Sequence, residues 1–241
     1  GTVGETSYYV IRNQGTMTIE SGTVINNSGY KKANPTGSMV GSSLICNGDC
    51  NGGGTLTIKG GTLTQNNFIA IKNGALGVLH VTGGKITSNH SAIQNWFKAD
   101  ITGGEIKGQL WTDAYKADES VGQTTIGGDA KFTGEIVMDI TGSVAPTLAI
   151  NGGELDVTWR ITSAAAKAGA KPAVSGGTFS SAVKEEYCAT GYIPKDNGDG
   201  TYGVKEGVYV AQIRDVKYET LQEAINAAKG GSTVRLLANV T

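Results

Sequence analysis

The chain contains few of the residue types that stabilise or localise many small proteins. Of its 241 residues, 4 are proline, 3 are cysteine and 17% are charged, against about 25% charged residues in ordinary domains. No apolar run approaches the roughly 18 residues of a membrane span, and no signal peptide is present. The net charge of −1 lacks the basic footprint of a nucleic-acid-binding domain. The sequence therefore predicts neither membrane insertion nor nucleic-acid binding.

Glycine, by contrast, is abundant, with 37 residues, and much of it belongs to a repeat. The stretch GTLTIKGGTLT at 54–64 has weaker copies, LHVTGGKITSN at 79–89, ADITGGEIKG at 99–108 and LAINGGELDV at 148–157. After position 61 the second glycine of each copy returns every 20 to 25 residues, at 84, 104, 128, 153 and 177. This period is typical of solenoids, in which each repeat buries its apolar face against its neighbours.

Each repeat contains three segments of strand-like sequence. Leu56, Ile58 and Leu63 alternate with polar residues on the two sides of a glycine pair, which indicates two short strands around a sharp corner. The third segment occurs as VIRN at 10–13, LICN at 44–47, AIKN at 70–73 and AIQN at 92–95, with LWTD at 110–113 and IVMD at 136–139 as weaker copies. We therefore expect an all-β fold, a right-handed single-stranded parallel β-helix with three strands per turn and about seven rungs.

The asparagines that end the third segments form a column of their own. Asn13, Asn47, Asn73 and Asn95 recur at matching places. Asparagine tolerates the left-handed αL conformation, and its amide can hydrogen-bond to the rung above or below. The column therefore predicts a stacked structural ladder rather than a binding site.

The pattern changes toward the C-terminus. We predict the β-helix over residues 1–180, a C-terminal cap and hairpin over 181–206, and a helix followed by a strand over 207–241. The helix has an apolar stripe formed by Leu221, Ala224, Ile225 and Ala228. It begins with a capping box at Thr220 and Glu223. An amphipathic helix that leads into a strand suits the N-terminal cap of a solenoid. We therefore expect this chain to be an excised piece of a tandem array, with head-to-tail contacts between modules.

The repeats, the tail GGTFSSAVKEEYCATGYIPKDNGDGTYGV and the segment VAQIRDVKYETLQEAINAAKGGSTVRLL resemble modules of large, adhesin-like cell-surface proteins of gut anaerobic bacteria. Their fold is similar to the pectate-lyase-like right-handed β-helix. The resemblance implies a secreted protein on the bacterial cell surface. It implies no particular activity, because this fold hosts lyases, hydrolases and adhesins alike.

Two outward-facing columns contain candidate functional side chains. His80 and Asp100 occupy consecutive rungs, so we expect the imidazole and the carboxylate to touch. Glu105, Asp129 and Glu154 follow three successive glycine pairs and are candidate glycosidase carboxylates, although an extra residue after Gly128 shifts Asp129. Such oxygens also suit Ca²⁺, but we predict no cofactor and no metal site.

Aromatic side chains and cysteines supply the remaining candidates. Trp96, Phe97 and Tyr115 follow corners and are candidate platforms for a glycan or a host protein, whereas Trp111, aligned with Ile93, is expected in the core. Cys46 and Cys50 flank NGD. They either form a local disulfide, or Cys46 is an ordinary exposed residue.

Three functional hypotheses follow from these features. The favoured hypothesis is a non-catalytic cell-surface β-helix module, an adhesin or spacer that binds a glycan or host protein. One alternative is a carbohydrate-active enzyme that uses the Glu105, Asp129 and Glu154 column. Another is an immunoglobulin-binding surface protein. Since no column combines an acid, a base and a substrate-binding arginine, we predict that the chain cleaves no polysaccharide.

Overall fold

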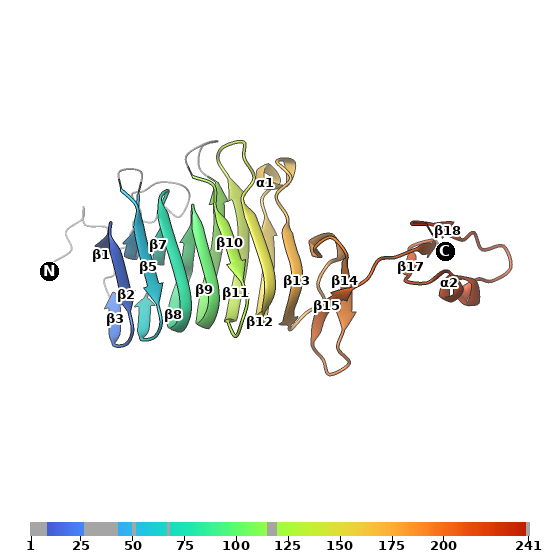
Figure 1. Ribbon diagram of the computed structural model, residues 1–241, viewed down its shortest axis with the longest axis horizontal. Helices are drawn as coiled ribbons and strands as arrows, with labels where there is room; N and C mark the ends of the chain where they lie inside the picture. The colour runs from blue at the N-terminus through green and yellow to red at the C-terminus, as the bar shows by residue number, and fades with distance from the viewer. Residues whose placement is uncertain (1–8, 27–42, 50–51, 67, 115–119, 240–241) are drawn as a thin grey trace.

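The computed structural model describes residues 9–26, 43–49, 52–66, 68–114 and 120–239. It is a parallel β-solenoid of about five turns. The described chain is elongated, with its first strand, β1, and its last strand, β18 (Arg235–Leu236), toward opposite ends (Figure 1). Its strands are β1 (Tyr9–Asn13), β2 (Thr16–Ile19), β3 (Thr23–Asn26), β4 (Ser43–Asn47), β5 (Gly54–Ile58), β6 (Thr62–Gln65), β7 (Ile69–Asn73), β8 (Gly77–Asn95), β9 (Lys98–Ala114), β10 (Gln123–Ile126), β11 (Lys131–Ile140), β12 (Thr147–Ile161) and β13 (Pro172–Phe179).

Long strands bend at corners and pair with several shorter strands. Within β8, the residues Gly77–Val81 pair with β5, Lys85–Ser88 with β6, and Ile93–Asn95 with β7, all in parallel. The whole of β8 then pairs in parallel with β9. The pairings of β8 with β5, β6 and β7 are in register, so equivalent residues of these turns stack into columns. The pairing of β8 with β9 contains register shifts near its corners.

The number of turns is smaller than the seven rungs that we counted from glycine markers. A glycine corner is only one part of a turn, and the last corner belongs to an incomplete one. Gly177 lies in β13, which ends at Phe179 before the chain enters the short 3-10 helix η1 (Glu185–Tyr187). Counting corners therefore overestimates the number of closed turns.

The solenoid interior is a column of aliphatic side chains. Leu56, Ile58 and Leu63 are 0% exposed, whereas Thr57, between the first two, and Thr64, just after Leu63, are half-buried. The alternation predicted from the sequence is therefore confirmed. Each turn buries its apolar side chains only against the neighbouring turns, which is why the core extends through the whole solenoid.

Glycine is required at the corners for two reasons. Gly84 and Gly104 have φ values of 80° and 84°, a region that side chains rarely adopt. In addition, a Cβ at Gly104 would lie 2.7 Å from the backbone oxygen of Gly83. Both predicted roles, positive φ and close backbone approach, are present at the same position.

The asparagine ladder is confirmed. Nδ2 of Asn13 donates to Oδ1 of Asn47 at 2.7 Å, Asn47 donates to Asn73 at 2.7 Å, and Asn73 donates to Asn95 at 2.8 Å. The suggested αL backbone is wrong, because Arg214 is the one non-glycine residue with positive φ in the described part of the chain. These asparagines remain in strand conformation, which keeps their amides in line.

One register differs from the sequence alignment by a single residue. Asn95 pairs with Thr112, and Gln94 pairs with Trp111, whereas the alignment placed Asp113 beside Asn95 and Trp111 beside Ile93. The shift places Leu110, 0% exposed, in the core beside Ile93. Trp111 is buried as predicted, but it occupies the outward column of Gln94.

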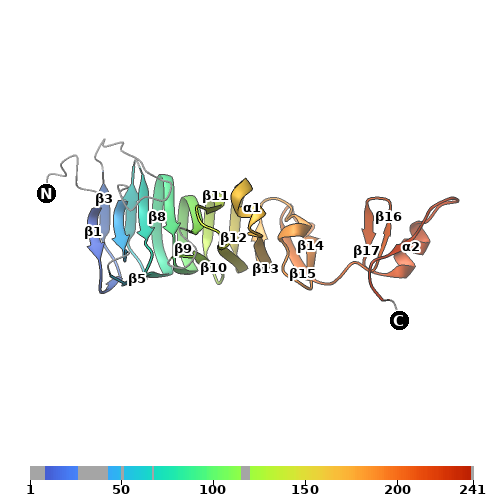
Figure 2. The ribbon, with the colours of Figure 1, turned by 90° about the horizontal axis from the view of Figure 1, so that it is seen from above.

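Beyond β13 the chain no longer follows the parallel solenoid. The helix α1 (Ser163–Lys167) lies earlier, between β12 and β13. After η1 come an antiparallel hairpin, β14 (Tyr192–Asp196) with β15 (Tyr202–Glu206), and a terminal unit (Figure 2). That unit comprises β16 (Ala211–Ile213), β17 (Val216–Tyr218), α2 (Leu221–Ala227) and β18 (Arg235–Leu236).

The helix α2 begins with the capping box of Thr220 and Glu223. Of its apolar stripe Ala224 is buried, but Ile225 is 51% exposed, so Ile225 does not pack against the chain's own solenoid. Contact of this face with another molecule stays a prediction. Among the described helices none is both long enough and apolar enough to cross a membrane.

Candidate functional site

The predicted neighbours His80 and Asp100 do lie side by side. They pair in register on β8 and β9, and Nδ1 of His80 is 3.5 Å from Oδ2 of Asp100. The side chains are 40% and 54% exposed, so solvent screens the pair, which then contributes about 1 kcal/mol or less. A ligand-binding role for this pair stays a prediction.

The predicted carboxylate column is interrupted by a lysine. Lys131, not Asp129, pairs with both Glu105 and Glu154, so Asp129 lies outside the column because of the extra residue in its turn. Nζ of Lys131 is 3.0 Å from Oε2 of Glu154, and Nζ of Lys85 is 3.4 Å from Oε2 of Glu105. Acidic and basic groups therefore alternate, and no two carboxylates of this column occupy adjacent rungs.

The arrangement does not suit a metal ion either. Within the described ranges no group of three or more histidine, cysteine, aspartate or glutamate side chains could hold one. The glutamates of the column are instead neutralised by lysines on neighbouring rungs.

Trp96 is not an exposed platform. Its side chain is buried, with Nε1 donating to Oδ2 of Asp113 at 3.0 Å. The ammonium of Lys72 lies 5.1 Å from its ring centroid, and the Ser120 hydroxyl donates to its backbone carbonyl at 2.8 Å. At 4% exposure the ring does not offer a surface on which a ligand could stack.

The other two aromatic candidates, Phe97 and Tyr115, give little further evidence for a binding platform. Phe97 is half-buried, and the ammonium of Lys98 lies 5.4 Å from its ring centroid. Tyr115 lies outside the described residues. The aromatic platform predicted from the sequence is therefore wrong for Trp96 and stays a prediction for Phe97.

Two charged groups are buried beside Trp96. Lys72 is 1% exposed, and burial lowers its pKa to about 8. Asp113 is also 1% exposed, and burial together with the charge of Asp139 raises its pKa to about 6. Among the described residues, Oδ1 of Asp113 has no hydrogen-bond partner. Burying such groups destabilises the fold, so their presence here was not expected from the sequence.

Cys46 is a free thiol, buried in β4. Burial raises its pKa, and its Sγ donates to the carbonyl of Gly48 at 3.7 Å. Neither predicted alternative applies to Cys46, because it is not half of a disulfide and it is not exposed. Cys50 lies outside the described residues.

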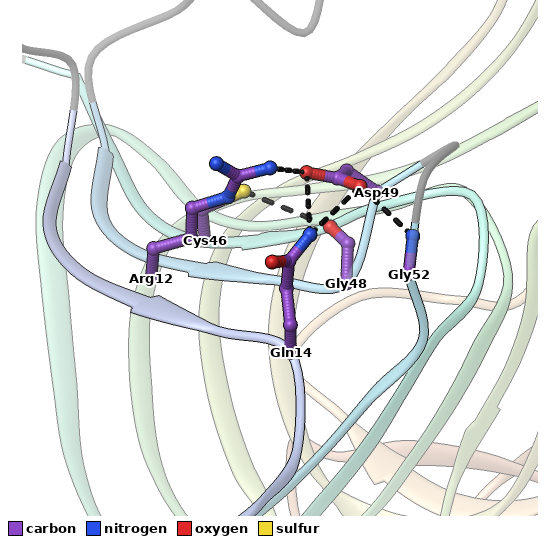
Figure 3. Close-up of polar contacts among 6 residues, drawn as sticks. All are labelled: Arg12, Gln14, Cys46, Gly48, Asp49 and Gly52. Atoms are coloured by element: carbon purple, nitrogen blue, oxygen red, sulfur yellow. Dashed lines mark hydrogen bonds and ion pairs between the residues drawn. The ribbon is translucent and has the colours of Figure 1, made fainter.

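Asp49, just beyond β4, gathers a cluster of polar contacts (Figure 3). Its carboxylate, 3% exposed, accepts from the Arg12 guanidinium, from Nε2 of Gln14 at 3.1 Å and from the backbone N–H of Gly52 at 3.1 Å. These bonds tie the segment after β4 to the first turn. Because the buried carboxylate of Asp49 has these three partners within the chain, we assign it a structural role.

A second polar cluster, which we call the Arg160 row, consists of His90, Ser91, Gln109, Glu135 and Arg160. The guanidinium of Arg160 donates from Nε to Oε1 of Glu135 at 2.9 Å and from Nη2 to Oε2 at 3.1 Å. Gln109 donates to Oε2 of Glu135 at 2.8 Å. The row thus connects side chains of β8, β9, β11 and β12.

Trp111 lies beneath this row and fixes its geometry. Cζ of Arg160 is 4.8 Å from the Trp111 ring centroid, and Nε1 of Trp111 donates to Oε1 of Gln109 at 2.9 Å. At the other end, Nδ1 of His90 is 2.7 Å from Oγ of Ser91. Burial, and then the charge of Arg160, lowers the pKa of His90, which favours the neutral imidazole.

The row remains accessible to a ligand. The side chains of Arg160 and Glu135 are 41% and 28% exposed. Arg160 retains N–H groups beyond the two that bind Glu135, and Oε1 of Glu135, which accepts one bond, can accept a further one. Fixed donors and acceptors therefore stand next to each other on a rigid surface.

Sequence analysis missed this row because it followed the glycine pairs. A different glycine marks it: Gln109 follows Gly108, and Glu135 follows Gly134, each just before an inward-facing residue. Gly108 and Gly134 both have positive φ, at 133° and 146°. This single-glycine column was a usable signal, although the distant Arg160 had none.

Comparison of the chain with protein-family models, with curated proteins and with solved structures finds no match. The assignment of the candidate site therefore rests on its geometry alone.

Proposed function

We propose that the chain is a non-catalytic module of a secreted bacterial cell-surface protein, and that it binds a glycan through the Arg160 row. In this proposal the solenoid is right-handed with three strands in each turn, as the successive pairing of β8 with β5, β6 and β7 suggests. The module serves as an adhesin, with the solenoid as a rigid spacer. The resemblance of the repeats to adhesin-like modules supports the cell-surface setting.

The observation that carries the proposal is the bidentate Arg160–Glu135 pair held over Trp111. A sugar hydroxyl both donates and accepts a hydrogen bond, so neighbouring hydroxyls suit a guanidinium next to a carboxylate. Because Trp111 and Gln109 hold the two groups in place, ordering them on binding costs little entropy.

A catalytic role is less well supported. Glutamates 105 and 154 are two rungs apart with Lys131 between them, and Lys131 is bonded to Glu154. Capture of a host protein such as an immunoglobulin remains the alternative partner for the same surface.

A combined glycan-array and host-protein screen of the purified chain tests the proposal. We expect binding to glycans, weakened at least about tenfold in Arg160→Ala, because a charge-assisted pair is worth about 1.5–3 kcal/mol. The matched control is Arg235→Ala, an exposed arginine in the terminal unit. Binding to host proteins alone, or equal glycan binding by both variants, would reject the Arg160 row as a glycan site.

A further inference from the structure

A groove of about 440 Å³ lies near the C-terminal end of the solenoid. Its volume is within the range of small-molecule sites, about 300–1,000 Å³. Polar side chains from successive turns line it: Lys131, Thr133, Glu154, Asp156, Thr178 and Ser180. Thr201, between the strands of the β14–β15 hairpin, contributes to one side. The groove is therefore bounded by the solenoid face and by an element outside it.

The groove lies next to the Arg160 row along β11. Glu135 is two residues beyond Thr133, and Gly134 between them has a positive φ of 146°, so the strand bends where the groove ends and the row begins. Lys131 and Thr133 line the groove, whereas Glu135 belongs to the row. At about 3.3 Å per residue, Lys131 and Glu135 are roughly 13 Å apart along the strand. One extended ligand can reach both.

The groove has a distinct charge and hydrogen-bonding character. Its charged lining residues are Lys131, Glu154 and Asp156, one positive and two negative, which gives a net charge of −1. Lys131 binds Glu154 at 3.0 Å, and Asp156 accepts the Ser180 hydroxyl at 2.6 Å. The carboxylates have further lone pairs for ligand hydroxyls or an ammonium group, whereas a ligand carboxylate would be repelled.

We propose that this groove is a second subsite of the same surface and holds further units of a linear glycan made of neutral or amino sugars. This inference rests on the proposed function, because it assigns the other end of that glycan to the Arg160 row. It specifies the ligand class, since uronic-acid chains are disfavoured by Glu154 and Asp156.

Binding of defined oligosaccharides to the intact chain tests this inference. The probes are the disaccharide and hexasaccharide of β-1,4-linked glucose, the same pair of β-1,4-linked N-acetylglucosamine and of its deacetylated form, and the hexamer of galacturonic acid. We expect the hexasaccharide of one neutral or amino series to bind at least about tenfold tighter than its disaccharide. Asp156→Ala and Thr178→Ala should remove that advantage and leave disaccharide affinity unchanged. The control Asp215→Ala, which changes an exposed carboxylate in the terminal unit, should alter neither the advantage nor the disaccharide affinity.

The outcomes separate this inference from the function on which it rests. Suppose that disaccharide binding depends on Arg160. If the hexasaccharide then binds no tighter than the disaccharide, or if the groove variants have no effect, the groove is rejected as a subsite and the glycan-binding function is retained. Preference for the galacturonic acid hexamer would reject the proposed ligand class. No binding of any of these probes, together with a negative glycan array, would reject both proposals. Circular dichroism of each variant establishes that lost binding is not lost folding.

Discussion

Two columns of polar side chains run along the same solenoid, and they differ in almost everything but spacing. The asparagine ladder is buried. Asn47, Asn73 and Asn95 are each 0% exposed, and the hydrogen bonds between their side-chain amides are 2.7–2.8 Å long. The charged column of Lys85, Glu105, Lys131 and Glu154 has side chains 57–66% exposed and ion pairs of 3.0–3.4 Å.

The difference shows that the stability contributed by a stacked pair depends more on its burial than on the contact itself. In the ladder each amide lost would leave buried partners unsatisfied, which costs about 1–3 kcal/mol per group. In the charged column, water and salt replace a lost partner, so an exposed pair contributes about 0–1 kcal/mol. Regular spacing in the sequence is common to both columns and does not distinguish them.

Breaking the ladder should have the largest effect. Nδ2 of Asn73 donates to Oδ1 of Asn95, to the carbonyl of Gly77 and to that of Lys98, and its Oδ1 accepts from Asn47. We expect Asn73→Ala to lower the free energy of unfolding by about 3–4 kcal/mol, since several buried groups lose a partner together. Urea denaturation followed by circular dichroism measures this.

The control for the ladder prediction is Asn226→Ala, an exposed asparagine on α2, which should change the same free energy by less than about 0.5 kcal/mol. If Asn73→Ala proved as mild as Asn226→Ala, the ladder would be a consequence of folding and not a source of stability.

The buried carboxylate of Asp113 extends the comparison, because burial of its charged form should destabilise the folded protein. The folded-state pKa of Asp113 is raised from 3.8 to about 6, so its favourable contribution is complete below pH 3.8 and is lost as pH rises through 6. The full loss is about 3 kcal/mol, at about 1.36 kcal/mol for each unit of pKa. Asp113→Asn should remove this pH dependence and raise the unfolding free energy at pH 8 by about 1–3 kcal/mol.

Unfolding free energies of the Asp113→Asn variant and the parent chain between pH 4 and pH 8 check this prediction. Asp156→Asn, which changes an exposed carboxylate, is the control and should leave the slope intact. A parent chain whose stability does not fall between pH 4 and pH 8 relative to Asp113→Asn would contradict the raised pKa.

The smallest effect is expected in the charged column. Lys131→Ala removes the ammonium that binds Glu154, and the unfolding free energy should fall far less than in Asn73→Ala, because solvent screens this exposed pair. Raising the salt concentration in the parent chain should reproduce most of this change, because exposed charges are screened. A loss comparable to that of Asn73→Ala would show that exposure does not explain the difference between the columns.

Much of the fold followed from local rules. The positive φ of Gly104 and the alternation of Leu56 and Ile58 concern single corners and strands, and the asparagine bonds follow once equivalent corners stack. The candidate site followed far less directly. Arg160 is separated from Glu135 by 25 residues, and no periodic pattern links the two.

The sequence by itself determined that this chain stacks small glycine-cornered repeats into a parallel β-solenoid, because backbone geometry and strand alternation act over a few residues. Only the tertiary structure decided which outward side chains are covered. It buried Lys72, Trp96 and Asp113, moved Asp129 out of its column, and shifted Trp111 by one residue beneath Arg160. The strand register and the burial of outward side chains depend on how neighbouring turns pack against each other. That packing is determined by residues that are distant in the chain.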